Sequence, residues 1–444
     1  MKTSIKKYRF YFLFILFAFI HFNTRAQGKF MLPEGIEKGK ISFKLINNLV
    51  VIPVEVNGTK LSFLLDTGVG STIMFNFSEA DSLEIKNATS IKIRGIGNEK
   101  SITGLKSRNN IVKIGKATDV NHTILIIFGD SLDLSTRMGI PIHGIIGYDF
   151  FKNFIVKTNY SSSKIHFYNS GSTKLKIDKK YEEFNLFLQD FKPYLKLSIN
   201  SVGTFEEKTL LIDSGSSDAI WLFDDQVFKN YPNKKYFNDF LGQGLSGVIF
   251  GKRAKLPKVT LGEFKLENVK VAFPDKEFIE RINFYKERDG SLGGEMLIRF
   301  TVIFDYPSNK IYLKKNNKFK KPFHYNMSGI SIKHDGVILI KEKAGTPLNN
   351  LEDDGAVKIR LSTVYNFYLA PKFVISEIRK DSPADLAGFM VGDEIKTING
   401  RVVHKYKLSE IIGLFASKAD KKITLEVNRA GILFSKKFYL KKVL

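Results

Sequence analysis

The stretch Phe63–Thr72 reads FLLDTGVGST, an apolar run that leads directly into Asp66, Thr67 and Gly68. Asp and Gly are common in tight turns, because Asp hydrogen-bonds to nearby backbone and Gly tolerates positive φ. One such triplet is explained equally well by a surface turn and by a reactive carboxylate at the end of a buried strand. The rest of the chain has to distinguish these two interpretations.

A second triplet, Asp213, Ser214 and Gly215, occurs in LLIDSGSSDAIW and lies 147 positions after the first (213 minus 66). Five glycines of the first part recur at the same offset: Gly95 and Gly97 match Gly242 and Gly244, Gly104 matches Gly251, Gly115 matches Gly262, and Gly147 matches Gly294. A triplet and five glycines in one register indicate two copies of one unit. We place these copies at residues 29–175 and 176–320.

Each copy has the pattern of β-structure. Residues 49–65 hold two alternating runs on either side of Asn57-Gly58, which is a strong signal for a two-residue hairpin. The counterpart at residues 194–213 has a longer turn, and a further hairpin is expected at Gly262. Helical periodicity is short and local. The predicted fold class is therefore mainly β, with two similar lobes.

The chain resembles the aspartic peptidases over roughly residues 40–315. Each copy has an apolar run into Asp-Thr/Ser-Gly, then a glycine-containing hairpin, then an apolar segment ending in Gly (GIIG and SLGG). DSGSSDAIW is close to the pepsin-type continuation, whereas GIIGYDFF is nearer to the retroviral type. The resemblance implies a bilobal, duplicated acid-protease β fold that hydrolyses a peptide or protein substrate with no cofactor and no metal.

The residue types suit that chemistry. Two carboxylates held ~3 Å apart cannot both ionise, so they share one proton and supply both a base for water and an acid for the substrate. We therefore predict that Asp66 and Asp213 are the catalytic residues. Four neighbours are predicted to support this dyad by hydrogen-bonding across it and by leaving room for the two turns to approach: Thr67, Gly68, Ser214 and Gly215.

The glycine-containing hairpins are expected to be flaps that contact substrate, through Gly95, Ile96, Gly97, Gly242 and Gly244. Neither hairpin has the tyrosine that pepsin-type enzymes usually carry in the first lobe, and Ile96 is expected to substitute through packing. Asp218 either perturbs the dyad or faces solvent, and we expect it to face solvent. The chain has no Cys and no nucleophile-elbow or phosphate-loop motif, which excludes those catalytic classes.

Residues 326–444 are predicted to form a third unit, because the segment at 372–403 resembles the PDZ family. Ser382-Pro383 predicts the start of a short helix, which Gly388 ends. Asn399-Gly400 predicts a hairpin. A second helix with one buried face is predicted from the spacing of Leu408, Ile411, Ile412 and Phe415.

The PDZ resemblance implies that a peptide binds as an added strand beside a helix, with backbone N–H groups holding its terminal carboxylate. The expected peptide-binding residues are Ser328, Gly329, Ile330, Ser331 and Ile332. An insertion at roughly residues 341–371 precedes the clear PDZ segment. In the alternative interpretation, this domain only supports the peptidase.

Residues 1–26 have the composition of a secretory signal peptide. A basic start precedes an apolar core at residues 10–22, and small Thr24 and Ala26 mark a cleavage site. An uncleaved anchor is the less favoured alternative, because this core is shorter than the ~20 residues that span a bilayer. With no Cys for disulfides, we expect a bacterial periplasmic or extracellular protein with no membrane span after cleavage.

The formal net charge is +24 at pH 7. The lysines are scattered along the chain, which favours a solvated basic surface over a nucleic-acid site. Their densest run, at residues 313–323, is predicted to be an interdomain linker. We therefore expect an exported aspartic endopeptidase with a PDZ domain. The rival classes are a non-catalytic peptide-binding protein that retains the fold, and a binder of lipopolysaccharide or nucleic acid through its basic surface.

Overall fold

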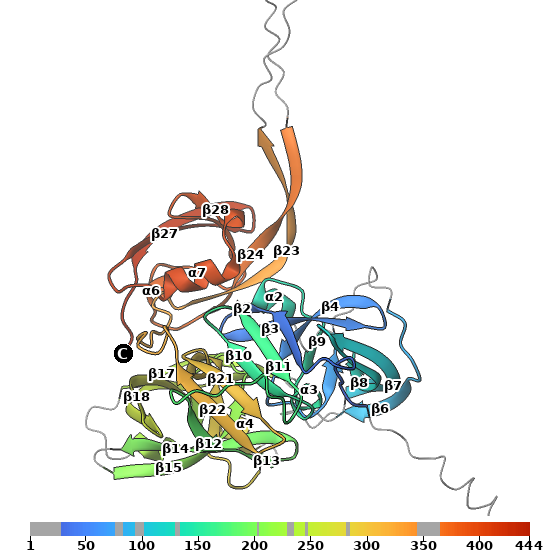
Figure 1. Cartoon of the computed structure of the whole chain (residues 1–444). Coiled ribbons are helices and arrows are strands. Elements are labelled where there is room, and N and C mark those ends of the chain that lie inside the picture. The colour runs from blue at the N-terminus through green and yellow to red at the C-terminus, as the bar shows by residue number, and fades with distance from the viewer. Residues whose placement is uncertain are drawn as a thin grey trace, which may run out of the picture.

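The computed structural model describes residues 28–75, 83–93, 102–128, 134–201, 204–228, 235–244, 247–280, 285–343 and 365–444. The predicted signal peptide at 1–26 and the flap residues Gly95, Ile96 and Gly97 lie outside these ranges. The described residues form two eight-stranded and two six-stranded sheets, with few and short helices (Figure 1). The predicted mainly β fold class is confirmed.

The two eight-stranded sheets have the same strand order. The first contains, in spatial order, β2 (Lys44–Ile46), β3 (Leu49–Val56), β4 (Thr59–Leu65), β9 (Gly144–Ile146), β5 (Thr72–Met74), β8 (Ala117–Ile127), β7 (Ile102–Ile114) and β6 (Thr89–Ile93). The second contains β13 (Phe187–Gln189), β14 (Lys192–Ser201), β15 (Thr204–Asp213), β20 (Gly290–Gly293), β16 (Ile220–Leu222), β19 (Phe264–Pro274), β18 (Gly247–Leu261) and β17 (Phe237–Gly244). Most neighbours are antiparallel, but β4–β9, β5–β8, β15–β20 and β16–β19 are parallel.

A six-stranded antiparallel sheet joins the two halves. Its order is β1 (Lys38–Ser42), β11 (Lys164–Tyr168), β10 (Ile155–Asn159), β21 (Phe300–Asp305), β22 (Lys310–Lys315) and β12 (Glu182–Asn185). The two halves meet where β10 pairs with β21 along its whole length. Since β11 belongs to the first half and β12 to the second, the boundary that we place at 175/176 falls between them and stays a prediction.

Short helices connect the strands of the first two sheets. They are α2 (Leu134–Met138), α3 (Tyr148–Phe151), α4 (Lys276–Glu280), α5 (Gly294–Leu297) and the 3-10 helix η3 (Asp225–Phe228). None of the helices in the described part of the chain has the length and apolar character needed to cross a bilayer.

The hairpin predictions are confirmed. Asn57 and Gly58 adopt positive φ between the paired residues Val56 and Thr59, and Gly262 does the same at the turn between β18 and β19. Both turns need a residue that tolerates the left-handed region, which Asn and Gly do best.

The segment at 313–323 is not a linker, so that prediction is wrong. Its first residues belong to β22, and Phe323 is buried against the second half, where the Arg299 guanidinium lies 3.5 Å from its ring centroid. Arg299 also donates hydrogen bonds to the carbonyl oxygens of Lys318, Phe319 and Lys321. The lysines of this run point outward while its aromatic residues anchor it, which charge density alone does not reveal.

The C-terminal unit is a sheet with two α-helices and one 3-10 helix. Its strands are β23 (Ile330–Lys343), β24 (Tyr365–Ile378), β25 (Glu394–Ile398), β27 (Lys422–Arg429) and β28 (Ile432–Tyr439), with β26 (Arg401–Val402) beside β25. The helices are α6 (Pro383–Leu386), η4 (Val403–Lys405) and α7 (Leu408–Phe415). Ser382 caps α6 by accepting from the Asp385 N–H, and Leu408, Ile411 and Phe415 form the buried face of α7, as predicted.

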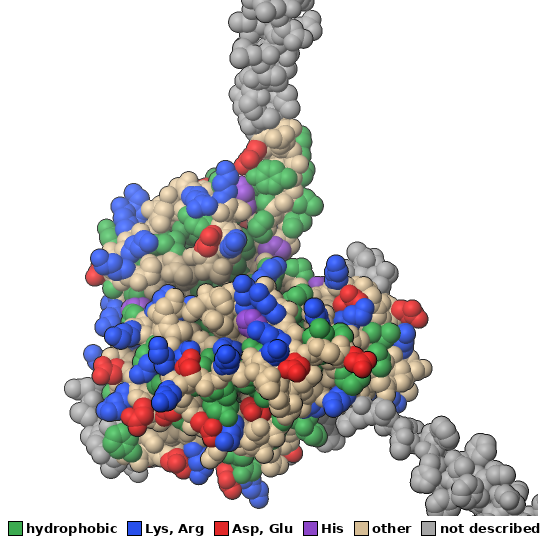
Figure 2. Space-filling view, viewed as in Figure 1, with side chains coloured by type: hydrophobic (Ala, Val, Ile, Leu, Met, Phe, Trp, Pro, Cys, Tyr) green, Lys and Arg blue, Asp and Glu red, His purple; other side chains and the backbone are tan. Residues whose placement is uncertain are grey.

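The outer halves of β23 and β24 extend from this unit as a two-stranded ribbon (Figure 1). This ribbon occupies part of the predicted insertion at 341–371, of which residues 344–364 lie outside the described ranges. Apolar side chains are exposed along it, including Val337, Leu339, Phe367 and Leu369 (Figure 2). On the same view, Lys and Arg are spread among acidic residues rather than gathered in one patch.

The shared sheet supplies a stability prediction. Phe151 is 1% exposed and packs against Phe304 and Tyr306 at ring-centroid distances of 5.2 and 5.3 Å. Phe151→Ala leaves a cavity between the halves and should lower the free energy of unfolding by about 3–5 kcal/mol, measured by urea denaturation. As the control, exposed Phe205→Ala should change it by about 0.5 kcal/mol or less. Equal effects of the two substitutions would contradict the assigned core.

Candidate active site

Asp66 and Asp213 stand at equivalent positions in the two eight-stranded sheets. Asp66 directly follows β4 and donates its N–H to the Ile146 carbonyl oxygen at the end of the parallel strand β9, at 2.9 Å. Asp213 ends β15, opposite Gly293 of the parallel strand β20. The apolar residues before them, Leu65 and Ile212, are buried in the core. Each carboxylate is thus carried on a turn whose base is fixed in a sheet.

Four hydrogen bonds cross between the two turns. The Thr67 N–H donates to Ser214 Oγ and the Ser214 N–H donates to Thr67 Oγ1, both at 3.0 Å. In addition, Thr67 Oγ1 donates to the Ile212 carbonyl at 2.6 Å, and Ser214 Oγ donates to the Leu65 carbonyl at 2.9 Å. Each hydroxyl therefore accepts from one backbone group and donates to another, all on the opposite turn. Because all four groups are buried, separating the turns would leave each without a partner.

Gly68 and Gly215 allow the turns to approach each other. A Cβ at Gly215 would overlap the Asp66 carboxylate, and a Cβ at Gly68 would lie 3.1 Å from Asp213 Oδ1. Each glycine also donates its N–H to the aspartate of its own triplet, Gly68 to Asp66 at 2.7 Å and Gly215 to Asp213 at 3.1 Å. The absence of side chains at these two positions brings both carboxylates into one site.

Two further glycines, Gly147 and Gly294, pack on the backbone behind the turns. A Cβ at Gly147 would overlap the Asp66 carbonyl oxygen, and one at Gly294 would lie 3.0 Å from the Ser216 carbonyl oxygen. These are the final glycines of GIIG and SLGG. The close approach of backbone to backbone is the physical reason for Gly at both positions.

Burial and the neighbouring charge of Asp213 together raise the pKa of Asp66 to about 8, although the N–H groups of Gly68 and Gly215 oppose the shift. Burial also raises the pKa of Asp213, opposed mainly by the positive charge of Arg288. Asp66 is 8% exposed, whereas Asp213 is half-buried. The pair therefore holds a proton at pH values where an exposed aspartate is ionised.

Two cations near the pair were missed by sequence reasoning. Arg288 acts on Asp213, and its Nε donates to the Gly290 carbonyl at 2.9 Å, which fixes it at the start of β20. Lys192 acts on both aspartates and begins β14. Both cations favour ionisation of one carboxylate. Their positions, Lys192 at the start of β14 and Arg288 just before β20, form no motif that a sequence search could detect.

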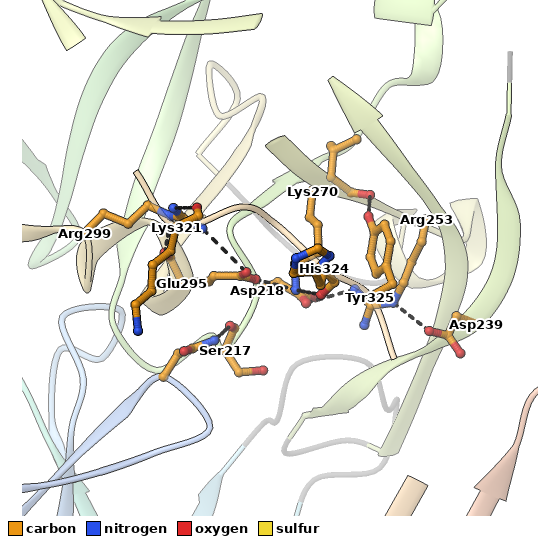
Figure 3. Close-up of polar contacts among 12 residues, drawn as sticks. Ser217, Asp218, Asp239, Arg253, Lys270, Glu295, Arg299, Lys321, His324 and Tyr325 are labelled. Atoms are coloured by element: carbon orange, nitrogen blue, oxygen red, sulfur yellow. Dashed lines mark hydrogen bonds and ion pairs between the residues drawn. The ribbon is translucent and has the colours of Figure 1, made fainter. Parts of the chain in front are cut away.

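Asp218 does not face solvent, so that expectation is wrong. Its side chain is 13% exposed, and Oδ1 accepts from Arg253 Nη1 at 2.8 Å while Oδ2 accepts from Trp221 Nε1 at 2.7 Å. The Nε of Arg253 donates to Asp239 on β17 at 2.9 Å (Figure 3). Although burial raises the pKa of Asp218, the charges of Arg253 and Lys270 and the hydrogen bonds from Trp221 and Arg253 together outweigh it and hold this pKa below its usual value. Asp218 thus ties the turn of Asp213 to β17.

Two equivalent hairpin tips contact the carboxylate turns from the opposite half. Asn47 and Asn48 join β2 to β3 with positive φ, and Asn48 Nδ2 donates to the Ser217 carbonyl at 2.9 Å. Asp190 and Phe191 join β13 to β14 in the same way. There the Phe191 ring lies 4.8 Å from that of Tyr148, and a Cβ at Gly70 would lie 3.3 Å from Phe191 Cβ. Positive φ is unfavourable for an aromatic residue, so this packing holds Phe191 in place.

Of the predicted flap residues, only Gly242 and Gly244 are described. Both belong to β17, which pairs with β18 in a hairpin. No atom lies within 4 Å of a Cβ built at Gly242. The contact of these residues with substrate stays a prediction.

The predicted peptide-binding loop at Ser328–Ile332 begins β23. Ser328 is fully buried, and Gly329 has φ +84° with its carbonyl accepting from the Arg379 N–H at 2.9 Å. Ile330 and Ile332 are buried in the core of the C-terminal unit. The loop leads into β23, the edge strand of its sheet, and the binding of a peptide by these residues stays a prediction.

A Thr–His–Asp arrangement occurs elsewhere but is closed to substrate. His122 Nδ1 lies 2.8 Å from Asp119 Oδ2, and Nε2 lies 2.8 Å from Thr72 Oγ1. All three side chains are buried behind the Asp66 turn, where no substrate can approach the hydroxyl. No group of three or more His, Asp or Glu suited to a metal ion occurs among the described residues.

Two family models match the sequence. Residues 52–150, which include Asp66 and the GIIG segment, match the model for an aspartyl protease. Residues 374–429, from β24 to the end of β27, match the model for a PDZ domain. Among curated proteins, none matches the sequence. The chain therefore joins an aspartyl protease domain to a C-terminal PDZ domain.

Proposed function

We propose that this protein is an exported aspartic endopeptidase, in which Asp66 and Asp213 activate water for peptide-bond hydrolysis. The observation that carries the proposal is the closeness of the two carboxylate turns, held by the reciprocal hydrogen bonds of Thr67 and Ser214. Their shared burial adds to it, because two adjacent buried carboxylates retain one proton between them. Export rests on the signal-like composition of residues 1–26.

The proposed mechanism gives the two carboxylates different roles. Asp213, which has the positive Arg288 nearby, is the group that ionises first and takes a proton from the attacking water. Asp66, the more deeply buried of the two, keeps the shared proton and donates it to the carbonyl oxygen of the scissile peptide. The tetrahedral intermediate then collapses as a carboxyl group returns a proton to the leaving amine. No covalent intermediate and no metal are needed.

The surrounding residues position this pair. Thr67 and Ser214 hold the two turns together, while Gly68 and Gly215 leave room for the carboxylates and bind them through N–H groups. Gly242 and Gly244 are proposed to contact substrate from the β17–β18 hairpin, with Gly95, Ile96 and Gly97 as the flap of the other half. The PDZ domain is proposed to bind a peptide segment of the substrate or of a partner.

The main rival is a peptide-binding protein that retains the fold without catalysis. Incubating the mature protein with a diverse peptide mixture from pH 3 to 8 and analysing the products by mass spectrometry separates the two. New peptide termini that disappear in Asp66→Asn support the peptidase. Binding without any cleavage supports the rival.

Because the two carboxylates act as a unit, their substitutions should be non-additive. Asp66→Asn and Asp213→Asn should each lower kcat/KM about as much as the double variant does, with every variant folded by circular dichroism. The exposed pair member Glu207→Gln serves as the control and should retain the parental rate. A single variant with near-parental activity would rule out the dyad.

The raised pKa of Asp66 predicts the pH dependence of stability and rate. Since the folded state binds this proton more tightly, the stability it contributes is complete below pH 4 and is lost as the pH rises through about 8. Asp66→Asn removes that loss, so its Tm gain over the parent should be larger at pH 9 than at pH 4.5. For the same reason, the alkaline limb of the parental pH–rate profile should lie near pH 8. A Tm difference that does not change with pH would contradict the raised pKa.

Gly215→Ala tests the geometry of the pair. The new Cβ would overlap the Asp66 carboxylate, so the turns must separate and activity should fall by two orders of magnitude or more, as ~1 Å displacements do. Gly413→Ala is the matched control, because Gly413 lies exposed on α7, outside the peptidase domain, and its Cβ would meet no atom within 4 Å. It should retain most of the activity in the same peptide assay. Full activity of Gly215→Ala would show that the two turns do not form one site.

A further inference from the structure

The peptide-binding edge of the PDZ domain faces the first half of the protein. β23 is the edge strand of its sheet, and α7 packs beside it. A peptide that adds a strand to this sheet beside a helix would use this edge, so the inference below rests on the proposed peptide-binding role. In the structure, another segment of the chain already lies at this edge, beside β23 and α7.

That part is the segment 134–139, which consists of α2 and Gly139. Helix α2 packs against β23 (Figure 1). At its end, a Cβ at Gly139 would lie 3.0 Å from Leu408 Cβ, the first residue of α7. The segment thus contacts both elements that would flank a bound peptide.

The segment is firmly held by the peptidase domain. Met138 is buried in its core, and Ser135 Oγ bonds both the N–H and the carbonyl of Ile142, at 3.0 and 3.2 Å. Gly139 itself donates to the Ser135 carbonyl at 2.9 Å. The contact therefore joins two surfaces that are each held in place by their own domain.

The loop that would hold a terminal carboxylate is also engaged internally. Asn326 Oδ1 accepts from the N–H groups of Ser328 and Gly329, at 3.0 and 3.2 Å. The N–H of Ile330 donates to Ser328 Oγ at 3.0 Å. These are the backbone donors at which a peptide carboxylate would be bound, and here side chains of the same loop occupy them.

We propose that segment 134–139 is the resident occupant of the PDZ groove, so that this domain is closed by its own chain and opens only when an internal peptide segment separates the groove from α2. A free carboxyl terminus would gain no affinity over an internal segment, because the side chains of Asn326 and Ser328 already accept from the N–H groups of the loop. The ligand class is therefore an extended stretch within a polypeptide, which matches the substrate of an endopeptidase.

The contact also reaches the catalytic side. The Arg137 guanidinium of α2 lies 4.6 Å from the Phe240 ring of β17, and the Arg379 guanidinium of the PDZ domain lies 4.8 Å from Phe237 of the same strand. Arg253 connects β17 onward to Asp218, five residues after Asp213. Because α2 contacts β17 through Arg137 and the PDZ domain contacts it through Arg379, separating α2 from the groove changes how β17 is held and so couples groove opening to the β17–β18 hairpin.

A reversible cross-link tests this proposal, because the chain has no native Cys. In Gly139→Cys/Leu408→Cys, the two Cβ atoms would lie 3.0 Å apart, so a small outward shift reaches the ~3.5–4.5 Å of a disulfide and oxidation should lock α2 onto α7. The probes are fluorescent peptides with apolar residues at alternate positions, prepared both as free acids and as amides. All variants carry Asp213→Asn, so that the probe is not consumed and binding is measured independently of catalysis.

We expect the reduced protein to bind the probes about tenfold or more tighter than the oxidised one, since locking removes the open state. A wedge, Gly139→Phe, should bind tighter than the parent, whereas Gly171→Phe should not; both have positive φ, but Gly171 has no neighbour within 4 Å. Acid and amide probes should bind equally.

Equal binding by the oxidised and reduced proteins would overturn the proposal and leave peptide binding by the PDZ domain intact. Tenfold tighter binding of the free-acid probes would show that the loop N–H groups do bind a terminal carboxylate, and would overturn the proposed ligand class. If no variant binds any probe, both the proposal and the peptide-binding role fail.

Discussion

The reciprocal hydrogen bonds between Thr67 and Ser214 are the constraint on which the site depends. Two carboxylates repel each other when ionised and lose hydration when buried, and both effects oppose the approach of the two turns. The hydroxyls bring the turns together because each donates to and accepts from the opposite backbone. The sheet in which β10 pairs with β21 adds a second direct connection between the two halves.

Burial of the carboxylates has an energetic cost that the rest of the site limits. N–H groups of Gly68 and Gly215 bind them, and the positive charges of Lys192 and Arg288 favour one ionised group. In the proposed mechanism, the result is a state of the pair in which one proton is retained and one is lost. That state is the one in which acid and base chemistry can occur at the same site.

The main features of this fold could be predicted from local signals. The turns at Asn57-Gly58 and Asn399-Gly400, the cap at Ser382 and the buried face of α7 follow from backbone and side-chain preferences that act over a few residues. The two Asp-Thr/Ser-Gly triplets could be recognised as a pair because they and five glycines recur at the same offset. Contacts between distant segments carried no such signal: Arg253 reaches Asp218 across 35 positions, and Phe323 anchors a run whose lysines indicated a linker. Asn326, whose side chain accepts from the amides of the proposed peptide-binding loop, likewise has no sequence signal of that role.

Direct titration of the two carboxyl groups tests the central claim most directly. With the aspartate side-chain carbons labelled, NMR spectra from pH 3 to 10 follow each carboxyl of Asp66 and Asp213. The account predicts coupled titration, in which one proton leaves at low pH and the second stays on the pair until about pH 8. Two independent transitions near the ordinary value of about 3.9 would show that the carboxylates do not share a proton, and would contradict the account.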